Sequence, residues 1–498
     1  MKSSTVSQAS PVGAVSVQPF EPTVGQIPLC VDLDGTLVQT DTLWESLALL
    51  ARRPRDLLRC PLWLLGGRAY FKRKVAEVTQ VNPTMLPYRK EVLSFLQEQR
   101  EMGRKLILAT AADERIARGV AEHLGIFDAV ICGNGVVNMK GKAKLEAIRQ
   151  MCPEGFDYIG DSMVDLVLWG RAEHAYLVAP THRVLKRARA LGRPVEVLAA
   201  RENVVAALFR AIRPHQWVKN LLLLLPLILS HQVTSLSKLL IVLLGIVAFN
   251  LCASAVYVAN DLLDLENDRR HMSKRCRPFA SGRLPLSYGP PLVCLSLMLA
   301  ASLSVICLPW SFVPVLGLYA VTSMAYSLYL KRLLLLDTMA LAGLYTLRIL
   351  AGGTAAGVPV SSWLMAFSMF LFLSLAFAKR YTELISLERT ATTQKTQIQG
   401  RSYRVEDIRI IESVGPASGY TAVLVLALYI NSDVVGTLYA DPFRLMLICP
   451  LLMYWITRLW FFARRGALDA DPVLFALRDR VSWHVGLAIG VVFLFAWL

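Results

Sequence analysis

Nine residues from Asn260 to Asp268 form the most chemically informative pattern in this chain. They read Asn-Asp-Leu-Leu-Asp-Leu-Glu-Asn-Asp and follow an apolar stretch, Leu239 to Val258, that contains no charged residue. Asp261, Asp264 and Asp268 are three and four residues apart, so a helix would carry them on one face. Carboxylates at the end of a membrane helix are unfavourable unless a cation neutralises them. Mg²⁺ prefers oxygen ligands and commonly joins carboxylates to phosphates, so the pattern predicts a Mg²⁺ site.

A run of basic residues follows the aspartates directly. Because basic side chains bind phosphate, the acidic and basic runs together predict a diphosphate site. A solvated helix end followed by a mixed-charge loop is the simpler alternative. The residues expected to bind the substrate here are Asn260, Lys274, Arg275 and Arg277, and the same run contains Arg269, Arg270 and His271.

The composition predicts a soluble part followed by a membrane part. The chain has 498 residues, of which 55% are hydrophobic, and the apolar residues are concentrated after about residue 215. The net charge of +16 fits cytoplasmic loops and anionic lipids or phosphates better than nucleic acid, because no basic strand is interleaved with aromatic residues. Nine scattered cysteines without a Cys-x-x-Cys pair support neither zinc nor disulfides. Residues 1–25 have no apolar signal-peptide core, and we expect them to be disordered.

Three apolar segments of the N-terminal half end in polar residues. Pro28–Val31 leads into Asp32-Leu33-Asp34-Gly35-Thr36, Lys105–Ala109 leads into Thr110, and Asp157–Ile159 leads into Gly160-Asp161-Ser162. Helical patterns lie between these segments, at Glu114–Leu124 and Ala143–Met151. The alternation predicts an α/β domain with a doubly wound parallel sheet.

The ordered set of these motifs resembles the haloacid dehalogenase (HAD) superfamily of phosphohydrolases over residues 26–182. The resemblance implies that Asp32 is the nucleophile and that Asp34 is the general acid and then the general base. It implies that Thr110 and Lys144 bind the phosphoryl group; Lys142 competes for the lysine role, but Lys144 better fits the start of a helix. It also implies a Mg²⁺ ion held by Asp32, the Asp34 carbonyl and Asp161, with Asp165 supporting that shell.

The residues between the first two motifs leave room for a small helical cap. Leu62–Leu65 and Tyr70–Phe71 lie there among Arg68 and Lys72–Lys74, so this region is either the core of the cap or an amphipathic patch on the membrane. After the HAD region, residues 183–212 are rich in arginine and predict a basic linker or interfacial helix.

Residues 213–498 predict an all-α membrane domain of about nine helices. The loops 264–289 and 379–416 are rich in Arg and Lys, so we expect them and the HAD domain to face the cytoplasm of a bacterial plasma membrane. The apolar stretches lie at about 218–230, 239–259, 290–308, 312–330, 334–351, 360–378, 418–431, 443–462 and 482–498.

A second group of polar residues lies at the ends of these stretches or inside them. Arg348 interrupts an apolar helix, which predicts either a functional role or a structural pairing with a carboxylate. Together these residues would surround a cavity with carboxylates and cations at its cytoplasmic mouth. The group comprises Tyr326, Lys331, Asp337, Arg348, Lys379 and Arg380, with Tyr329 as an alternative to Tyr326.

The Asn-Asp-x-x-Asp-x-x-x-Asp motif in a helical membrane domain resembles the UbiA superfamily of prenyltransferases. Members typically carry a second aspartate-rich motif, whereas this chain offers only Asp337. Within the superfamily, the resemblance is to the decaprenyl-phosphate phosphoribosyltransferases, over residues 210–498. It rests on Arg213–Asn220, Ser254–Tyr257, Lys274–Pro278, Leu347–Gly353, Lys379–Tyr381 and Ala476–Arg480.

This resemblance implies Mg²⁺-dependent transfer of phosphoribose from phosphoribosyl pyrophosphate (PRPP) to a polyprenyl phosphate. Lys219 joins the expected substrate-binding residues, and the HAD domain is expected to remove the 5-phosphate from the product. Membrane lipids are expected partners, nucleic acid is not, and the oligomeric state is open. The alternatives are an aromatic or quinone prenyltransferase, a phosphatase with a passive membrane anchor, and a transporter.

Overall fold

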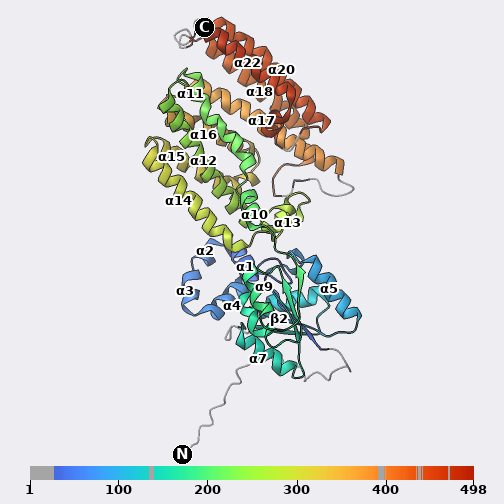
Figure 1. Cartoon of the computed structure of the whole chain (residues 1–498). Helices are drawn as coiled ribbons and strands as arrows, with labels where there is room; N and C mark the ends of the chain where they lie inside the picture. Colours follow the sequence, from blue (N-terminus) through green and yellow to red (C-terminus); the bar gives the residue numbers. More distant parts are fainter. Residues whose placement is uncertain are drawn as a thin grey trace, which may run out of the picture. The chain divides into compact units, whose positions relative to one another are not determined.

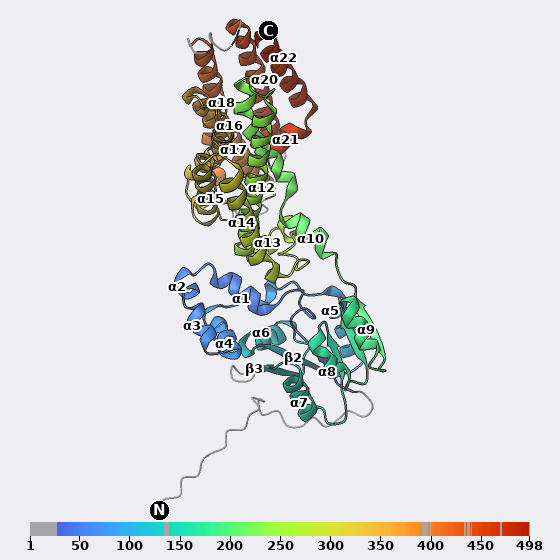
Figure 2. The same ribbon diagram turned by 60° about the vertical axis from the view of Figure 1, so that its left-hand side comes forward.

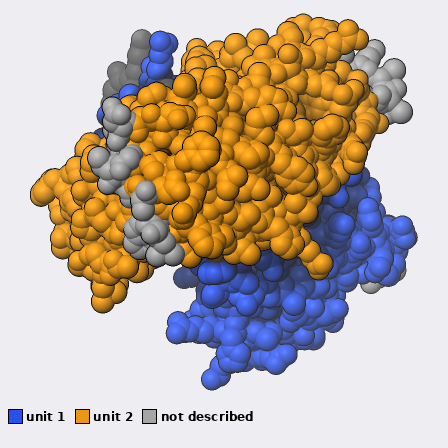
Figure 3. Space-filling view, turned by 90° about the horizontal axis from the view of Figure 1, so that it is seen from above, with its two compact units in different colours: residues 1–212, 257–292 blue, residues 213–256, 293–498 orange. Residues whose placement is uncertain are grey.

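The structure, a computed structural model, divides the chain into two compact units. It describes residues 27–133, 139–390, 397–398, 400–432, 435, 439, 441–468 and 471–497. One unit contains Met1–Ile212 and Tyr257–Leu292, and the other contains Arg213–Val256 and Val293–Leu498 (Figure 1 and Figure 3). The predicted disordered N-terminus, residues 1–25, lies outside the described residues.

The first unit is built on a six-stranded sheet in which every neighbouring pair of strands is parallel. The strand order is β3-β2-β1-β4-β5-β6. This arrangement confirms the predicted doubly wound α/β fold. The strands are β1 (Leu29–Val31), β2 (Leu106–Asp113), β3 (Ala129–Gly133), β4 (Asp157–Gly160), β5 (Ala175–Val178) and β6 (Val195–Ala199).

Apolar side chains cover both faces of the sheet, as a buried parallel sheet requires. Along β1, Leu29 and Val31 enter one hydrophobic core, whereas Cys30 enters the core on the other face. This alternation follows from the two-residue period of a strand. Helices α5 (Lys90–Glu101) and α6 (Glu114–Leu124) contribute to the first core, and α7 (Lys142–Met151), α8 (Leu166–Trp169) and α9 (His182–Arg189) contribute to the second.

From β1 the strand order runs to β2 and β3 on one side and to β4, β5 and β6 on the other. β1 is therefore the point at which the order switches direction. In open α/β sheets, ligands bind at such a switch point, beyond the carboxyl ends of the strands. Asp32 follows β1 and Asp161 follows β4, so the topology brings both motifs to this position.

Four helices form the cap between β1 and β2. They are α1 (Thr42–Leu50), α2 (Pro54–Leu57), α3 (Cys60–Leu65) and α4 (Arg68–Val78), and they lie together at one side of the sheet in both views (Figure 1 and Figure 2). The cap has a small core of its own, made of Leu50, Phe71 and Val75. Trp63 packs against this core, whereas the neighbouring leucines of α3 do not.

The stretch predicted as a basic linker, residues 183–212, carries part of the sheet domain. The strand β6 lies inside this stretch, at Val195–Ala199, and pairs with β5. Ala199 is the only buried residue of β6, and Glu196 interrupts the apolar run that would mark a strand. α10 (Val204–Ala211) then leads to the second unit.

The membrane part has six helices that are long and apolar enough to span a bilayer, or up to seven if a bent pair counts as one span, among the described residues. The sequence predicted about nine, because the shorter α15 and the segment at 214–229 were included. The helices are α11 (Leu225–Leu229), α12 (Leu236–Leu263), α14 (Gly289–Cys307), α15 (Phe312–Leu328), α16 (Leu336–Ala356), α17 (Ser362–Thr390), α18 (Ile408–Ile430), α20 (Ile448–Arg465), α21 (Pro472–Arg478) and α22 (Arg480–Trp497), preceded by the 3₁₀ helix η3 (Pro214–Leu224).

Glycine allows α16 to pack closely against η3. A Cβ atom at Gly352 would lie 2.0 Å from the carbonyl oxygen of Leu223. Small residues of this kind let helices approach in a membrane, where the hydrophobic effect does not hold them together. The contact also fixes the segment of η3 that carries Lys219 and Asn220.

We predict that Gly352→Ala destabilises the protein, because the obstructing atom belongs to the backbone and cannot rotate away. Overpacking of this kind typically reduces the free energy of unfolding by about 1–3 kcal/mol. Gly343→Ala is the matched control, since nothing lies within 4 Å of its added Cβ on the same helix. Thermal unfolding in detergent would measure both variants, and equal melting temperatures would contradict the proposed contact.

Candidate active sites

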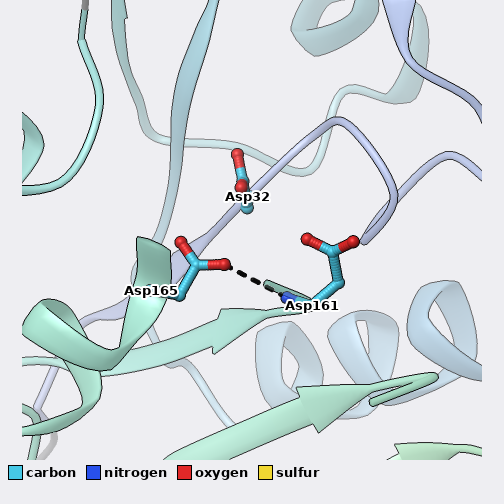
Figure 4. A group of neighbouring side chains, drawn as sticks. All are labelled: Asp32, Asp161 and Asp165. Carbon is cyan, nitrogen blue, oxygen red and sulfur yellow. Dashed lines mark hydrogen bonds between the residues drawn. The ribbon is translucent and has the colours of Figure 1, made fainter. Parts of the chain in front are cut away.

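Three carboxylates gather beyond the ends of β1 and β4 (Figure 4). One oxygen from each of Asp32, Asp161 and Asp165 lies within 4.8 Å of the others, and this is the one such acidic group found among the described residues. Three hard oxygen donors fit a Mg²⁺ ion. Gly35 makes room for this group, because its φ is +77° and a Cβ there would lie 2.3 Å from Asp161 Oδ2.

Lys144 is bound to the predicted nucleophile. Its Nζ lies 2.9 Å from Asp32 Oδ1 and donates a hydrogen bond of 3.0 Å to the Tyr158 hydroxyl. Tyr158 in turn donates to Asp165 Oδ1 at 3.1 Å. Lys142, the alternative lysine, is exposed at the first residue of α7. The sequence did not indicate Tyr158, because a tyrosine inside a strand reads as a core residue.

Burial gives Asp34 the proton affinity of a general acid. Desolvation raises its pKa to about 7, and the neighbouring Asp41 adds to the increase. Its carboxylate accepts a hydrogen bond of 2.8 Å from the backbone N–H of Thr42, which begins α1. A group that titrates near neutral pH can both give and take a proton. Asp34 therefore suits the acid and base role, and its side chain is outside the acidic group of Figure 4.

Desolvation also raises the pKa of Asp32 and that of Asp161, and neighbouring carboxylates add to both increases. Lys144 opposes the shift at Asp32. Crowded carboxylates of this kind need a cation in order to stay ionised. The donor set and its electrostatics therefore fit a divalent metal ion.

A cavity of about 280 Å³ opens on this site. Thr110 does not line it: the residue is fully buried, and its hydroxyl accepts a hydrogen bond of 3.0 Å from the Ala112 N–H. Its role in phosphate binding stays a prediction. The lining residues are Asp32, Asp34, Gly35, Gln39, Thr40, Asp41, Ala111, Lys140, Gly141, Lys144, Asp161, Ser162, Val164, Asp165 and Pro285.

The aspartate-rich segment does not form the single helical face that its spacing predicts. α12 ends at Leu263, and the chain turns at Asp264 before α13 (Leu265–Arg270) begins. Arg277 joins the other two aspartates, at 3.1 Å from Asp261 Oδ1 and 2.6 Å from Asp268 Oδ2. The helix break thus leaves Asp264 half-exposed, and the segment still brings two buried carboxylates to one cation.

Around this pair, Asn260 is half-buried, whereas Lys274 and Arg275 are exposed on the 3₁₀ helix η4 (Lys274–Cys276). Desolvation raises the pKa of Asp268, and the Arg277 charge opposes this increase. Asp268 therefore depends on a positive partner to stay ionised.

A buried ion pair connects the aspartate-rich segment to the cap. Arg269 donates to both carboxylate oxygens of Glu45, at 3.0 and 2.6 Å, and to the Ala280 carbonyl at 2.9 Å. The side chains of Arg269 and Glu45 are only 7% and 6% exposed. Since Asp34 binds the first residue of α1 and Glu45 lies on the same helix, α1 touches both functional segments.

In the second unit, the guanidinium of Arg348 donates hydrogen bonds to three other residues. It donates to Asn220 Oδ1 at 2.8 Å, to the Leu344 carbonyl at 2.6 Å and to the Tyr319 hydroxyl at 3.1 Å. Its Cζ also lies 5.1 Å from the centre of the Tyr345 ring. These contacts hold the side chain in place in the interior of the unit, where it is 5% exposed.

Lys219 lies beside this arrangement and forms an ion pair with Asp471. Its ammonium group is 5.7 Å from the centre of the same Tyr345 ring. Lys379 is half-buried and interacts electrostatically with Asp471 and Lys219. The predicted cations Lys219, Arg348 and Lys379 thus belong to one region of the second unit.

Asp337, the only aspartate of the second polar segment, forms ion pairs with two arginines. It is 0% exposed, with Oδ2 2.5 Å from Arg380 Nε and Oδ1 2.7 Å from Arg401. Tyr326 donates to the same carboxylate at 2.9 Å. Glu383 lies 2.5 Å from Arg380 and 3.6 Å from Arg401, so two acids and two arginines form one network. Lys331 precedes Asp337 in sequence; it is half-buried and lies on the 3₁₀ helix η6 (Leu330–Arg332).

Sequence reasoning missed the partners that hold these side chains. Arg401, Glu383 and Asp471 were not singled out, because each lies in a charged segment that reads as an ordinary loop or helix end. Asn250 was also missed, although a polar amide inside the apolar α12 is a usable signal. It accepts a hydrogen bond of 2.6 Å from Asn220.

Two family models match the chain. The UbiA prenyltransferase family matches residues 222–484, and the haloacid dehalogenase-like hydrolase family matches residues 29–168. The chain belongs to the UbiA prenyltransferase family. Its N-terminal part is a HAD-type hydrolase domain, and the membrane part of this UbiA protein crosses the bilayer several times.

Relatives of this UbiA protein resemble either the whole chain or its membrane part. An uncharacterised protein of Sinorhizobium fredii is 37% identical over 95% of this chain and 91% of its own length. The nodulation protein NoeC of Azorhizobium caulinodans is 36% identical over 57% of this chain and 92% of its own length. The decaprenyl-phosphate phosphoribosyltransferase of Mycobacterium tuberculosis is 33% identical over 57% of this chain and 92% of its own length.

The buried ion pair between cap and aspartate-rich segment yields a prediction about stability. Glu45→Gln leaves Arg269 buried without its anionic partner, which typically destabilises a protein by about 3–5 kcal/mol. The matched control is Glu266→Gln, because the Glu266–Arg52 pair is 26% and 34% exposed. Exposed pairs contribute about 0–1 kcal/mol. Thermal unfolding in detergent should separate the two variants, and equal effects would show that the buried pair does not hold the segment.

Proposed function

We propose that this UbiA-family enzyme transfers a 5-phosphoribosyl group from PRPP to a polyprenyl phosphate and releases pyrophosphate. We further propose that its HAD domain removes the 5-phosphate, which yields polyprenylphosphoryl-ribose. The observation that carries the proposal is the 33% identity to a decaprenyl-phosphate phosphoribosyltransferase, over 92% of that protein.

The charges of the second unit support an anionic acceptor. Asp337 already bonds Arg380 and Arg401, so it is a poor candidate for a second metal-binding carboxylate. Lys219, Arg348 and Lys379 are basic and buried or half-buried, which suits a phosphate more than a neutral aromatic ring. We assign the lipid phosphate to these cations, with Lys331 and Tyr326 as further candidates.

The aspartate-rich segment is assigned to the pyrophosphate of PRPP. Asp261 and Asp268 direct oxygens at one cationic group, so they fit a Mg²⁺ ion, with the half-exposed Asp264 as a third ligand. A bound Mg²⁺ would supply charge stabilisation for the leaving pyrophosphate. Arg277 would then direct its charge to the phosphates, together with Lys274 and Arg275. Asn260 is assigned to the same substrate.

The transfer itself needs no strong general base. An oxygen of the lipid phosphate forms a bond to ribose C1 while the bond from C1 to the pyrophosphate oxygen breaks. The attacking oxygen is already anionic, so the protein has only to position the two reactants and stabilise the leaving group.

The hydrolase step follows from the contacts of Asp32, Asp34 and Lys144. Asp32 attacks the phosphorus of the 5-phosphate while Asp34 gives a proton to the departing ribose oxygen. Lys144, 2.9 Å from Asp32, stabilises the charge that gathers at the phosphoryl group. Asp34 then takes a proton from the water that hydrolyses the aspartyl-phosphate and releases inorganic phosphate.

The charge pattern of the loops also leads us to propose an orientation. The segments around 264–289 and 379–416 carry many Arg and Lys residues, which favours the cytoplasmic side of a plasma membrane. PRPP would be available on that side.

We predict that Asp34→Asn separates the two reactions. Membranes that contain the variant, supplied with Mg²⁺, polyprenyl phosphate and PRPP labelled in the ribose, should accumulate the phosphoribosyl lipid. Wild type should yield the dephosphorylated ribosyl lipid. Loss of a general acid typically slows such a step by about 10²–10⁴-fold, so thin-layer separation of the two lipids would show the difference.

Two further variants make this experiment decisive. Asp441→Asn, in a half-exposed pair with Arg444, is the control and should behave like wild type. Asp268→Asn should form no labelled lipid at all. Consumption of a prenyl diphosphate without any use of PRPP would reject the phosphoribosyl assignment and favour an aromatic prenyltransferase. Equal dephosphorylation by Asp34→Asn would reject the assignment of the HAD domain.

A further inference from the structure

The cap of the hydrolase domain carries a row of apolar side chains in water. No residue of α3 is buried, and Leu58, Leu62 and Leu65 are 81%, 67% and 85% exposed. Leu57 and Leu64, beside them, are also exposed. We call these five leucines the leucine row. Because burial of a leucine side chain is favourable, a row of exposed leucines is unusual on a protein surface.

The leucine row is not a misplaced part of the cap core. Trp63 and Cys60, on the same short helix, pack against Leu50, Phe71 and Val75. The helix therefore has an inner side that completes the cap and an outer side that the cap does not use. An apolar side that faces out on such a helix is typical of a binding surface.

Basic residues accompany the leucine row. Between residues 52 and 65 the chain has four arginines and one aspartate. Arg53, Arg55 and Arg59 are exposed, and Arg59 is 3.5 Å from that single aspartate, Asp56. Leucines beside an excess of arginine match the two layers of a membrane surface, which are acyl chains and anionic headgroups.

The leucine row begins beside the end of a membrane helix. Arg52, two residues before α2, donates a hydrogen bond of 2.6 Å from Nε to the carbonyl of Leu263. Leu263 is the last residue of α12, the most apolar of the spans found in the described residues, and both residues belong to the first unit. Because a membrane helix ends at this contact, the bilayer is the apolar environment that we expect next to the leucine row.

We propose that α2 and α3 insert the leucine row into the interfacial region of a bilayer that contains anionic lipids, with the neighbouring arginines on lipid phosphates. The cap is thus a membrane-docking element of the hydrolase domain. This role is separate from both reactions and does not depend on the proposed substrates.

Depth-dependent fluorescence quenching tests the docking directly. The full chain, with an environment-sensitive fluorescent amino acid at position 62, would be reconstituted in vesicles of phosphatidylcholine and phosphatidylglycerol with a doxyl-labelled lipid. Position 102 is the control, because Met102 is 59% exposed at the end of α5. We expect strong quenching at position 62 and little at 102, and equal quenching would overturn the proposal. Energy transfer between differently labelled copies, without lipid quenching, would make the row a chain–chain interface and overturn it too.

A charge variant tests the headgroup contact without altering the leucines. Arg55→Gln with Arg59→Gln should reduce the quenching at position 62 by roughly half or more, since each arginine near an anionic surface strengthens membrane binding. Arg149→Gln with Arg171→Gln, two exposed arginines outside the cap, should leave it unchanged. Unchanged quenching in the cap variant would overturn the anionic-lipid assignment.

A third measurement rests on the proposed hydrolase function. Leu58→Ser with Leu62→Ser and Leu65→Ser should slow the release of phosphate from a lipid in vesicles by roughly fivefold or more, because docking concentrates the domain at the surface. Hydrolysis of soluble p-nitrophenyl phosphate should be unchanged. Equal lipid hydrolysis by variant and wild type would contradict docking, whereas inactivity of wild type on lipid would contradict only the hydrolase assignment.

Discussion

Charge compensation away from water is the constraint on which both units depend. A buried charge is strongly unfavourable unless an opposite charge lies beside it. When the two charges lie on elements that are distant in sequence, their pairing also holds those elements together. Glu45 and Arg269 join the cap to the segment between two membrane helices. Asp337, Arg380 and Arg401 join three segments of the second unit. The same side chains that satisfy this constraint also hold the predicted substrate-binding groups in fixed positions.

The charges around the two proposed reaction sites have opposite signs. In the hydrolase domain, carboxylates outnumber the adjacent cation, Lys144, and the surplus of negative charge suits a metal ion. In the second unit, the cations Lys219, Arg348 and Lys379 lie in one region, and such a group of positive charges suits a phosphate. The sign of the charges that gather at each site therefore indicates the kind of ligand that we propose for it.

Sequence patterns predicted the parts of the fold that depend on local periodicity. Strand-ending motifs indicated Asp32 and Asp161, because the carboxyl ends of parallel strands meet at one edge of a sheet. The pattern could not reveal the turn at Asp264, since three aspartates with helical spacing do not show where a helix stops. Nor could it reveal the pairing of Glu45 with Arg269, which depends on tertiary contact across more than two hundred residues of chain.

Pro285 has a consequence for how such a two-domain enzyme evolves. This residue belongs to the stretch between α12 and α14, yet it lines the cavity of the hydrolase domain. Recombination that moved only the N-terminal hydrolase segment to another membrane protein would therefore leave out a residue that lines its pocket. The residues that line the pocket come from two separate parts of the sequence. Selection on the hydrolase activity therefore acts on the loop between two membrane helices as well as on the soluble domain.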